Sequence, residues 1–281
     1  MVERVAADAA ESEASSLPKA VFVSGASSGI GRGVAVWLAR HGTAVAVGYH
    51  SGEERAAAVV AEIEREGGRA VAVQGDMSSE GDVERAFDDA ARALGPLSGC
   101  VVNAGLQADS PFETMTLAEW RKPLALDLDG AFLTAREFVR RLPPREPIAR
   151  GEDTRAPRGS IVFVSSVHGF VPWAGHANYA AAKAGVDMLM KTLAQECAAS
   201  GLRANAVQPG AIRTPINEDV WGDDAKLEAL LGIVPARRLG AVDDVAEAVG
   251  WLLSARAAYV TGTTLVVDGG MSLYPSFIGN G

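Results

Sequence analysis

Tyr179 and Lys183 stand four residues apart in the segment Asn178-Tyr-Ala-Ala-Ala-Lys183, downstream of the serine pair Ser165-Ser166. On a helix these positions share one face, so the Lys183 ammonium can lie beside the Tyr179 phenol. A phenol is a poor base at neutral pH, but a nearby cation favours its ionised form. A hydroxyl from Ser166 would bind the substrate oxygen and hold the reacting carbon near that phenol. The three residues predict a proton-transfer site, unless the spacing is a coincidence and Tyr179 only packs its ring.

A glycine-rich turn lies upstream, in Ala20-Val-Phe-Val-Ser-Gly-Ala-Ser-Ser-Gly-Ile-Gly31. The apolar run predicts a buried strand, and the residues after the turn predict a helix. Gly25, Gly29 and Gly31 allow a tight turn and close backbone approach to a pyrophosphate, which then meets the amides of the helix N-terminus. Because the glycines follow a strand and open a helix, they predict a dinucleotide site, although each glycine alone could be only a structural turn.

Together, the Gly-x-x-x-Gly-x-Gly spacing and the Tyr-x-x-x-Lys pair resemble the short-chain dehydrogenase/reductase family. Further matches occur in the family's order, at Asn103-Ala-Gly105, Ser165-Ser166, Pro209-Gly-Ala-Ile-Arg-Thr214 and Asp268-Gly-Gly270. The resemblance covers about residues 18 to 281. It implies one α/β domain of the Rossmann type, a doubly wound parallel sheet of about seven strands with helices on both faces, and a nicotinamide cofactor.

The resemblance also implies which residues contact that cofactor. Lys183 and Tyr179 would hold the nicotinamide ribose. The remaining implied contacts, ordered from the phosphates through adenine and ribose to the carboxamide end, are Gly25, Ser27, Ser28, Gly29, Ile30, Gly31, Asp76, Met77, Asn103, Ala104, Gly105, Pro209, Gly210, Ile212 and Thr214. No metal site is expected.

The choice between NAD and NADP should be made where the second predicted strand, Ala44 to Gly48, ends. An acidic residue there would bind the adenosine 2′-hydroxyl and repel a 2′-phosphate. The chain has Tyr49-His50-Ser51 at this point, with neither a carboxylate nor an arginine. We therefore expect His50 and Ser51 to contact the cofactor and the enzyme to use both NADP and NAD, with a lean toward NADP.

Composition agrees with one large α/β domain. The chain has 281 residues, of which 48% are hydrophobic, and short apolar runs alternate with amphipathic helices, as in a parallel sheet with helices on both faces. Its net charge of −9 argues against nucleic acid as a partner. Cys100 and Cys197 fit reduced structural thiols. Neither a membrane span nor a secretion signal is evident, so we expect a cytoplasmic protein that does not bind membranes.

Two segments differ in composition from this α/β pattern. Residues 1–17 are rich in Ala, Ser and Glu, which predicts a disordered tail before the domain of residues 18–281. Residues 142–157 interrupt a predicted helix, Leu117 to Leu142, with several prolines. This connection predicts a solvated surface loop rather than a ligand-binding patch.

Around the site, Ser165-Ser-Val-His168, Val171-Pro-Trp173, Gly210-Ala-Ile-Arg-Thr-Pro-Ile-Asn217 and Gly270-Met-Ser-Leu-Tyr-Pro-Ser-Phe277 resemble bacterial glucose 1-dehydrogenases. The resemblance implies oxidation of the C1 hydroxyl of β-D-glucose to the lactone, with hydride passing to the nicotinamide. Gln107, Ser166, His168 and Asn217 would contact the substrate, and residues 218–231 would close over it. His168 could equally be a packed loop histidine.

Two departures from the family pattern leave the substrate open. Asp127 stands where the family usually has an asparagine, so we expect a catalytic role for it with an altered pH dependence. Gln107 replaces the glutamate of glucose dehydrogenases, so another sugar, a polyol or a ketone could be the substrate. The alternatives are a carbonyl reductase of 3-oxoacyl thioesters or small ketones and, from another class, a regulatory protein that binds cofactor without turnover. The resemblance further implies a homotetramer built through residues 117–142 and 179–200 and the last strand.

Overall fold

The computed structural model describes residues 16–144 and 158–273 of the chain. Within these residues the strands form one parallel sheet in the order β3-β2-β1-β4-β5-β6-β7. They are β1 (Ala20–Val23), β2 (Ala44–Tyr49), β3 (Ala70–Gln74), β4 (Gly99–Val102), β5 (Gly159–Val164), β6 (Leu202–Pro209) and β7 (Thr264–Val267). From β1 the strands are added first toward one edge of the sheet, as β2 and β3, and then toward the other edge, from β4 to β7. Sheets of this kind open a crevice at the carboxyl ends of the strands where the order changes, here between β1 and β4. The predicted doubly wound fold is confirmed.

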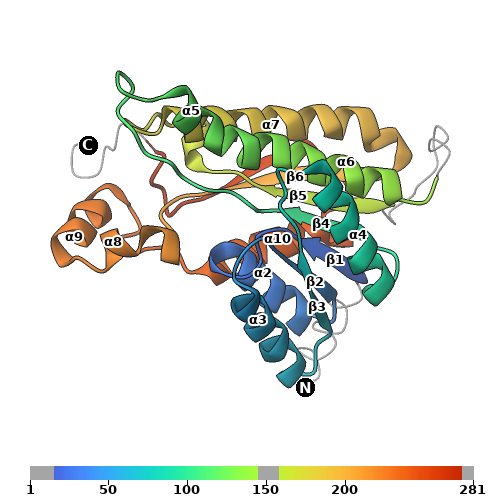
Figure 1. The fold of residues 1–281 in the computed structure, drawn as a ribbon. Helices are drawn as coiled ribbons and strands as arrows, with labels where there is room; N and C mark the ends of the chain where they lie inside the picture. The colour runs from blue at the N-terminus through green and yellow to red at the C-terminus, as the bar shows by residue number, and fades with distance from the viewer. Residues whose placement is uncertain (1–15, 145–157, 274–281) are drawn as a thin grey trace.

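Alternating strand residues feed two cores, one on each face of the sheet. Val21 and Val23 point to the core beneath α2 (Gly29–Arg40), α3 (Glu53–Arg65) and α10 (Val242–Leu253). Ala20 and Phe22 point to the other core, beneath α4 (Glu80–Leu94), α6 (Gly130–Arg141) and α7 (Ala177–Cys197). Figure 1 shows the sheet between these two helical layers. This period-two alternation is what a sheet buried on both faces requires.

The predicted helix from Leu117 to Leu142 is interrupted, which corrects the expectation of one continuous element. It consists of α5 (Leu117–Pro123), a π-helical segment at residues 124–129, and α6. Pro123 lacks the amide that would bond to the carbonyl of Glu119 one turn earlier. The side chain of Asn178 on α7 donates to that carbonyl instead, at 2.9 Å. The helix break is therefore tied to the helix that carries Tyr179.

Close packing joins α2 to α10. Gly33 lies so close to Val242 that a Cβ on Gly33 would meet the valine at 2.8 Å, and a Cβ on Gly250 would overlap the indole of Trp37. The two glycines allow these helices to approach each other over the sheet.

Arg203 on β6 caps the carboxyl end of α10. Its guanidinium donates to the carbonyls of Leu252, Leu253 and Ser254 at 2.7, 3.0 and 2.9 Å. These are the carbonyls that a helix end leaves without partners, and a cation there also matches the helix dipole. Burial lowers the pKa of Arg203 to about 10. The residue acts as an internal C-cap.

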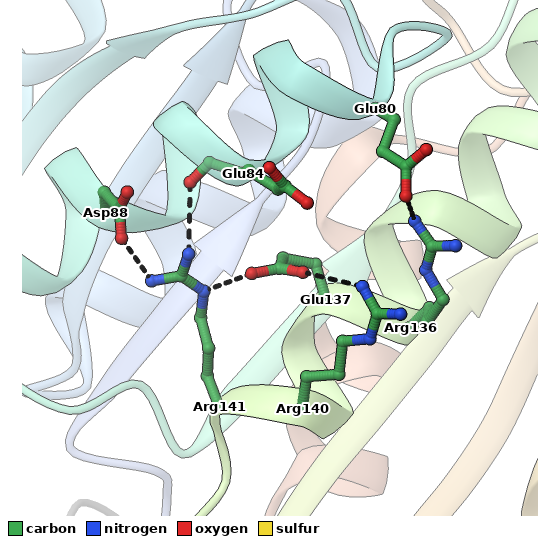
Figure 2. A network of polar contacts seen from close by, with 7 residues as sticks. All are labelled: Glu80, Glu84, Asp88, Arg136, Glu137, Arg140 and Arg141. Carbon is green, nitrogen blue, oxygen red and sulfur yellow. Dashed lines mark hydrogen bonds and ion pairs between the residues drawn. The ribbon is translucent and has the colours of Figure 1, made fainter.

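Ion pairs connect α4 with α6 (Figure 2). Arg141 donates to Asp88 and to Glu137, both at 2.6 Å, and Arg136 pairs with Glu80. Glu137 is buried whereas Asp88 and Glu80 are exposed. Exposed pairs contribute little, so the Arg141–Glu137 pair matters most, because its loss would leave a buried carboxylate without a partner.

The two segments of unusual composition, residues 1–17 and 142–157, are only partly described by the structure. Residues 1–15 of the expected tail lie outside the described residues, but Leu17 is buried and the Ser16 carbonyl accepts a hydrogen bond from the Ala255 amide. The ordered domain thus extends to Ser16. Most of the proline-containing connection, residues 145–157, is also outside the described part. Among residues 16–144 and 158–273, no helix is long and apolar enough to cross a membrane.

Candidate active site

Loops at the carboxyl ends of the parallel strands surround one cavity of about 1610 Å³. The predicted site residues come from the loops after β1 to β6, and the fold brings them together although they span nearly 200 positions. All of them line the cavity except Gly31: Gly25, Ser27, Ser28, Gly29, Ile30, His50, Ser51, Asp76, Met77, Asn103, Ala104, Gly105, Gln107, Asp127, Ser166, His168, Tyr179, Lys183, Pro209, Gly210, Ile212, Thr214 and Asn217. Their individual roles remain predictions.

The glycine turn after β1 is shaped to receive an anionic group. Gly25 and Gly29 have φ values of 63° and 55°, which side-chain-bearing residues rarely adopt. Gly31 lies beneath the turn, where a Cβ would overlap the Gly25 carbonyl and the Asn103 amide. The N-cap of α2, Ser28, makes no side-chain hydrogen bond to the first turn of the helix. The backbone amides in the first turn of α2 are therefore available to a phosphate.

Asn103 fixes this turn from the neighbouring strand. Its side-chain amide donates to the carbonyls of Ser24 and Gly25 at 2.9 and 3.1 Å, and its backbone amide donates to the Ser24 hydroxyl at 2.9 Å. The Asn103 side chain thus supports the phosphate turn, while its backbone and the following Ala104 and Gly105 face the cavity.

Arg55 is a cavity residue that the sequence reasoning missed. It lies in the first turn of α3, and its guanidinium folds back to the Ser51 carbonyl at 3.4 Å. Gly52, with φ of 88°, makes the turn that allows this, since a Cβ there would overlap the guanidinium. The expectation that no arginine stands near the end of β2 considered only the residues next to the strand. Gly52 is the residue in the sequence that could have indicated Arg55. Its left-handed turn brings the first turn of α3 back beside the end of β2.

The three predicted proton-transfer residues meet in the cavity. Tyr179 and Lys183 lie one turn apart on α7, with the Lys183 Nζ 5.5 Å from the centroid of the Tyr179 ring. Ser166 accepts a hydrogen bond from the His168 backbone amide at 3.2 Å, so its own proton is free to donate to a substrate oxygen. Ser165 also lines the cavity, but its hydroxyl donates its proton to the Lys183 carbonyl at 3.2 Å. Ser166 rather than Ser165 is therefore the serine that can serve the reaction.

Asp127 lies in the π-helical segment and contacts Lys183 directly. Its Oδ2 is 3.1 Å from the Lys183 Nζ, its Oδ1 accepts from the Leu106 amide at 2.9 Å, and its side chain is fully buried. Gly105 is required here, because a Cβ would meet both the carboxylate and the ammonium, at 2.8 and 3.1 Å. Short π-helical segments occur often at functional sites. The expected placement of Asp127 beside Lys183 agrees with this geometry.

The two charges affect each other's protonation. Burial raises the pKa of the Asp127 carboxyl, although Lys183 and the Leu106 amide lower it in part. Burial lowers the pKa of Lys183, but the negative charges of Asp127, Tyr179 and Asp187 outweigh burial, and the pKa lies above its ordinary value. We infer that Lys183 keeps its proton and that Asp127 is its counter-ion.

Two polar residues expected to bind substrate are engaged within the protein. The Asn217 amide donates to the Ile212 carbonyl at 3.0 Å, and its oxygen accepts from the Thr214 amide and hydroxyl at 3.2 and 3.1 Å. The His168 Nδ1 lies 3.1 Å from the Val171 carbonyl. Gln107 lines the cavity. The Asn217 oxygen is thus occupied, whereas one of the two Asn217 N–H groups is left for a substrate hydroxyl.

Apolar side chains also line the cavity. They include Leu106, Leu126, Phe170, Val171, Ile216 and Ile233. The segment predicted to close over the substrate contains α8 (Glu218–Trp221) and α9 (Asp224–Ile233), which project from the body of the domain in Figure 1. Leu230 and Ile233 of α9 line the cavity, and no residue of α9 is buried. This segment therefore adds apolar side chains to a cavity that polar residues such as Gln107 and His168 also line.

Comparison with known proteins gives the same family at every level. The family model described as enoyl-(acyl carrier protein) reductase matches residues 25–272. A 3β-hydroxysteroid dehydrogenase of Eggerthella lenta is 42% identical over 92% of this chain and 95% of its own. The chain belongs to the short-chain dehydrogenase/reductase family.

Other short-chain dehydrogenases act on different alcohols. A glucose 1-dehydrogenase of Gluconobacter oxydans is 36% identical, covering 93% of this chain and 95% of its own. The crystal structure of a gluconate 5-dehydrogenase from Burkholderia cenocepacia, in complex with NADP and tartrate, matches with a TM-score of 0.81. That structure is 31% identical and covers 91% of this chain and 95% of its own. The family match supports a nicotinamide-dependent oxidoreductase without specifying its substrate.

The described residues fit the nicotinamide cofactor that short-chain dehydrogenases use. The glycine turn and the free amides of α2 suit the pyrophosphate, and the family resemblance predicts that Tyr179 and Lys183 would hold the nicotinamide ribose. When bound, the cofactor would accept or give the hydride. Ser166 would then bind the substrate oxygen, Tyr179 would exchange its proton, and Lys183 would stabilise the phenolate.

Proposed function

We propose that this enzyme interconverts a bulky, largely apolar secondary alcohol of the hydroxysteroid class and the corresponding ketone, using a nicotinamide cofactor. In oxidation the carbinol carbon loses a hydride to the cofactor, and its hydroxyl loses a proton to the Tyr179 phenolate. In reduction both transfers reverse, and the phenol supplies the proton.

The observation that supports this substrate class is the apolar part of the cavity wall, to which Leu106, Phe170 and Ile233 contribute. A sugar needs several buried partners for its hydroxyls, because unpaired polar groups are costly. The Asn217 oxygen and one of the two Asn217 N–H groups are already bonded to Thr214 and Ile212, which leaves a single Asn217 N–H for a substrate. The cavity of about 1610 Å³ also exceeds the usual range for one small ligand, so it has room for a large substrate beside a dinucleotide.

The direct test is a side-by-side assay of the purified enzyme with a 3β-hydroxysteroid, β-D-glucose and cyclohexanol, using NAD and NADP at mildly alkaline pH. We expect kcat/KM for the steroid to exceed that for glucose at least a hundredfold. Tyr179→Phe should abolish turnover and keep cofactor binding, which distinguishes an enzyme from a cofactor-binding regulator. Faster turnover of glucose than of the steroid would refute the proposed class.

Oxidation of a sugar such as β-D-glucose at C1 is the second candidate. It is favoured by Gln107, which lines the cavity beside the catalytic residues, and by the similarity to the Gluconobacter enzyme. Gln107→Ala separates the two candidates. It should raise KM for a sugar substantially and leave KM for a steroid within about twofold.

We further propose that the enzyme uses both cofactors with a preference for NADP. Arg55 supports this preference, because its guanidinium lies at the cavity wall beside His50 and Ser51, where an adenosine 2′-phosphate would be bound. Arg55→Gln should weaken NADPH binding about tenfold and leave NADH binding unchanged, as measured by nucleotide fluorescence. Equal losses for both nucleotides would count against this role.

A homotetramer is proposed as the assembly. Met188 on α7 is 63% exposed and Phe132 on α6 is 44% exposed, while Leu265 and Val266 are uncovered on β7, the last strand in the sheet order. Large apolar side chains gathered on helices and on a sheet edge are typical of interfaces. Light scattering of the purified protein should give four times the chain mass, and a monomer would refute the proposal.

A further inference from the structure

Trp173 lies between two histidine rings at the edge of the cavity. The His176 ring is parallel to the indole within 5°, with centroids 3.4 Å apart, and the His168 ring covers the indole at 4.3 Å and 26°. Trp173 and His168 line the cavity, whereas His176 lies behind them and is buried. The indole is thus stacked against two imidazole rings and lines the cavity.

Both ring nitrogens of His176 face oxygen acceptors. Nδ1 lies 3.0 Å from the Ala174 carbonyl, and Nε2 lies 2.9 Å from the Asp109 carboxylate. The two contacts lie on different nitrogens of the ring, so they hold the imidazole in its orientation parallel to the indole. Asp109 reaches His176 from the loop after β4.

His168 is also held in place, because its Nδ1 lies 3.1 Å from the Val171 carbonyl. Burial lowers the pKa of His168, and the hydrogen bond to that carbonyl partly opposes this. The Ser110 amide also donates to the Gly175 carbonyl at 2.9 Å, so the loop of Asp109 is fastened to the loop of Trp173 at two adjacent points.

We propose that Asp109 and His176 are positioning residues that hold Trp173 as a rigid wall of the substrate site, and that this wall selects alcohols with a broad, rigid apolar body over small ones. This inference rests on the proposed function for its substrate class. Asp109 and His176 do not touch the substrate. They act through Trp173, which is 41% exposed and continues the apolar surface formed by Phe170 and Val171.

A large, rigid substrate gains affinity from each protein surface that is already held in place, because few protein side chains have to become ordered when it binds. A small alcohol reaches Ser166 and Tyr179 without contacting Trp173. Loosening the indole should therefore raise KM for a large substrate and leave the chemical step unchanged. This pattern differs from that of a general structural defect, which would affect both substrates.

The kinetic test compares a 3β-hydroxysteroid with cyclohexanol in Asp109→Asn, Trp173→Ala and the control Glu113→Gln, which changes an exposed charge on the same loop. We expect the steroid KM to rise about tenfold in Trp173→Ala and about fivefold in Asp109→Asn. The cyclohexanol KM and the kcat for both alcohols should stay within about twofold in Asp109→Asn. Equal KM changes for the two alcohols, a fall in kcat at constant KM, or no change would each overturn the inference.

A second measurement does not depend on the substrate. The chain has four histidines, so ¹⁵N-resolved NMR of the imidazoles at pH 7 can be assigned with His176→Gln. We expect the His176 imidazole resonances to change in Asp109→Asn, because the carboxylate beside Nε2 is lost, and to stay unchanged in Glu113→Gln. Unchanged His176 resonances in Asp109→Asn would overturn the positioning role of Asp109. If the wild type does not oxidise the steroid, the proposed function is wrong. The KM comparison then uses the largest alcohol that is oxidised, and equal KM changes again overturn the inference.

Discussion

Replacing Asp127 with asparagine removes one negative charge from beside Lys183 and keeps the size of the side chain. The carboxylate accepts from the Leu106 amide through Oδ1, and its Oδ2 is the ion-pair partner of the Lys183 ammonium. An asparagine keeps an oxygen for the Leu106 amide but removes the counter-charge, so the ammonium retains the Val164 carbonyl, at 3.4 Å. Removing the counter-charge of a buried ion should lower the stability by about 3–5 kcal/mol.

The larger consequence concerns the pH dependence of alcohol oxidation, for which Lys183 must stay protonated beside Tyr179. The Asp127 Oδ2 lies 3.1 Å from the Lys183 Nζ, and its negative charge does most to hold the pKa of Lys183 above its ordinary value. In Asp127→Asn that charge is lost, while burial, which lowers the pKa of Lys183, remains. The alkaline limb of the rate profile, where Lys183 loses its proton, should therefore move to lower pH.

The assay is kcat/KM for oxidation between pH 6 and pH 10 in wild type, Asp127→Asn and the control Asp129→Asn. Asp129 lies in the same π-helical segment but is exposed, so its charge is screened by solvent and its profile should match the wild type. An alkaline limb in Asp127→Asn that stays in place, or moves to higher pH, would show that the carboxylate does not hold the proton on Lys183.

The remaining predictions concern packing and the phosphate turn. Arg203→Met should lower the free energy of unfolding by about 2–4 kcal/mol in urea titrations, because the last carbonyls of α10 lose their donors. The exposed Arg65→Met should change it by less than about 0.5 kcal/mol, and equal effects would refute the capping role. Gly250→Ala should cost about 1–3 kcal/mol through overlap with the indole on α2, whereas Gly232→Ala, with open space around it on α9, should be neutral or slightly stabilising. Gly31→Ala should weaken NADPH binding at least tenfold in fluorescence titrations while the far-ultraviolet circular dichroism stays unchanged, and undiminished binding would contradict the tight packing beneath the turn.

The parts of the fold and site that could be predicted depend on residues that lie close together in the sequence. The glycines at 25, 29 and 31 and the pair Tyr179 and Lys183 carry their geometry in the chain itself, because a turn and a helix fix where near neighbours point. The alternation of apolar strands with amphipathic helices similarly specified the parallel sheet.

What could not be predicted depends on contacts between distant segments or on how a polar group is used. Arg55 reaches the cavity only because Gly52 adopts a left-handed turn. Asn217 reads as a substrate ligand in the sequence, yet its amide is engaged in a local cap. The break after Pro123 was visible as a proline in a helix, but its compensation by Asn178 joins residues 59 positions apart.

Asn178 connects more than the helix break to α7. Its amide donates to the Ala108 carbonyl at 2.8 Å as well as to the Glu119 carbonyl at 2.9 Å, and its oxygen accepts from the Tyr179 amide at 2.8 Å. The loop that borders the substrate, the start of α5 and the residue that moves the proton therefore share one buried side chain. Substrate range and catalytic competence are then difficult to change separately by exchanging that loop, in the laboratory or in evolution. A grafted loop that does not offer a carbonyl to Asn178 would misplace Tyr179 before it met any new substrate.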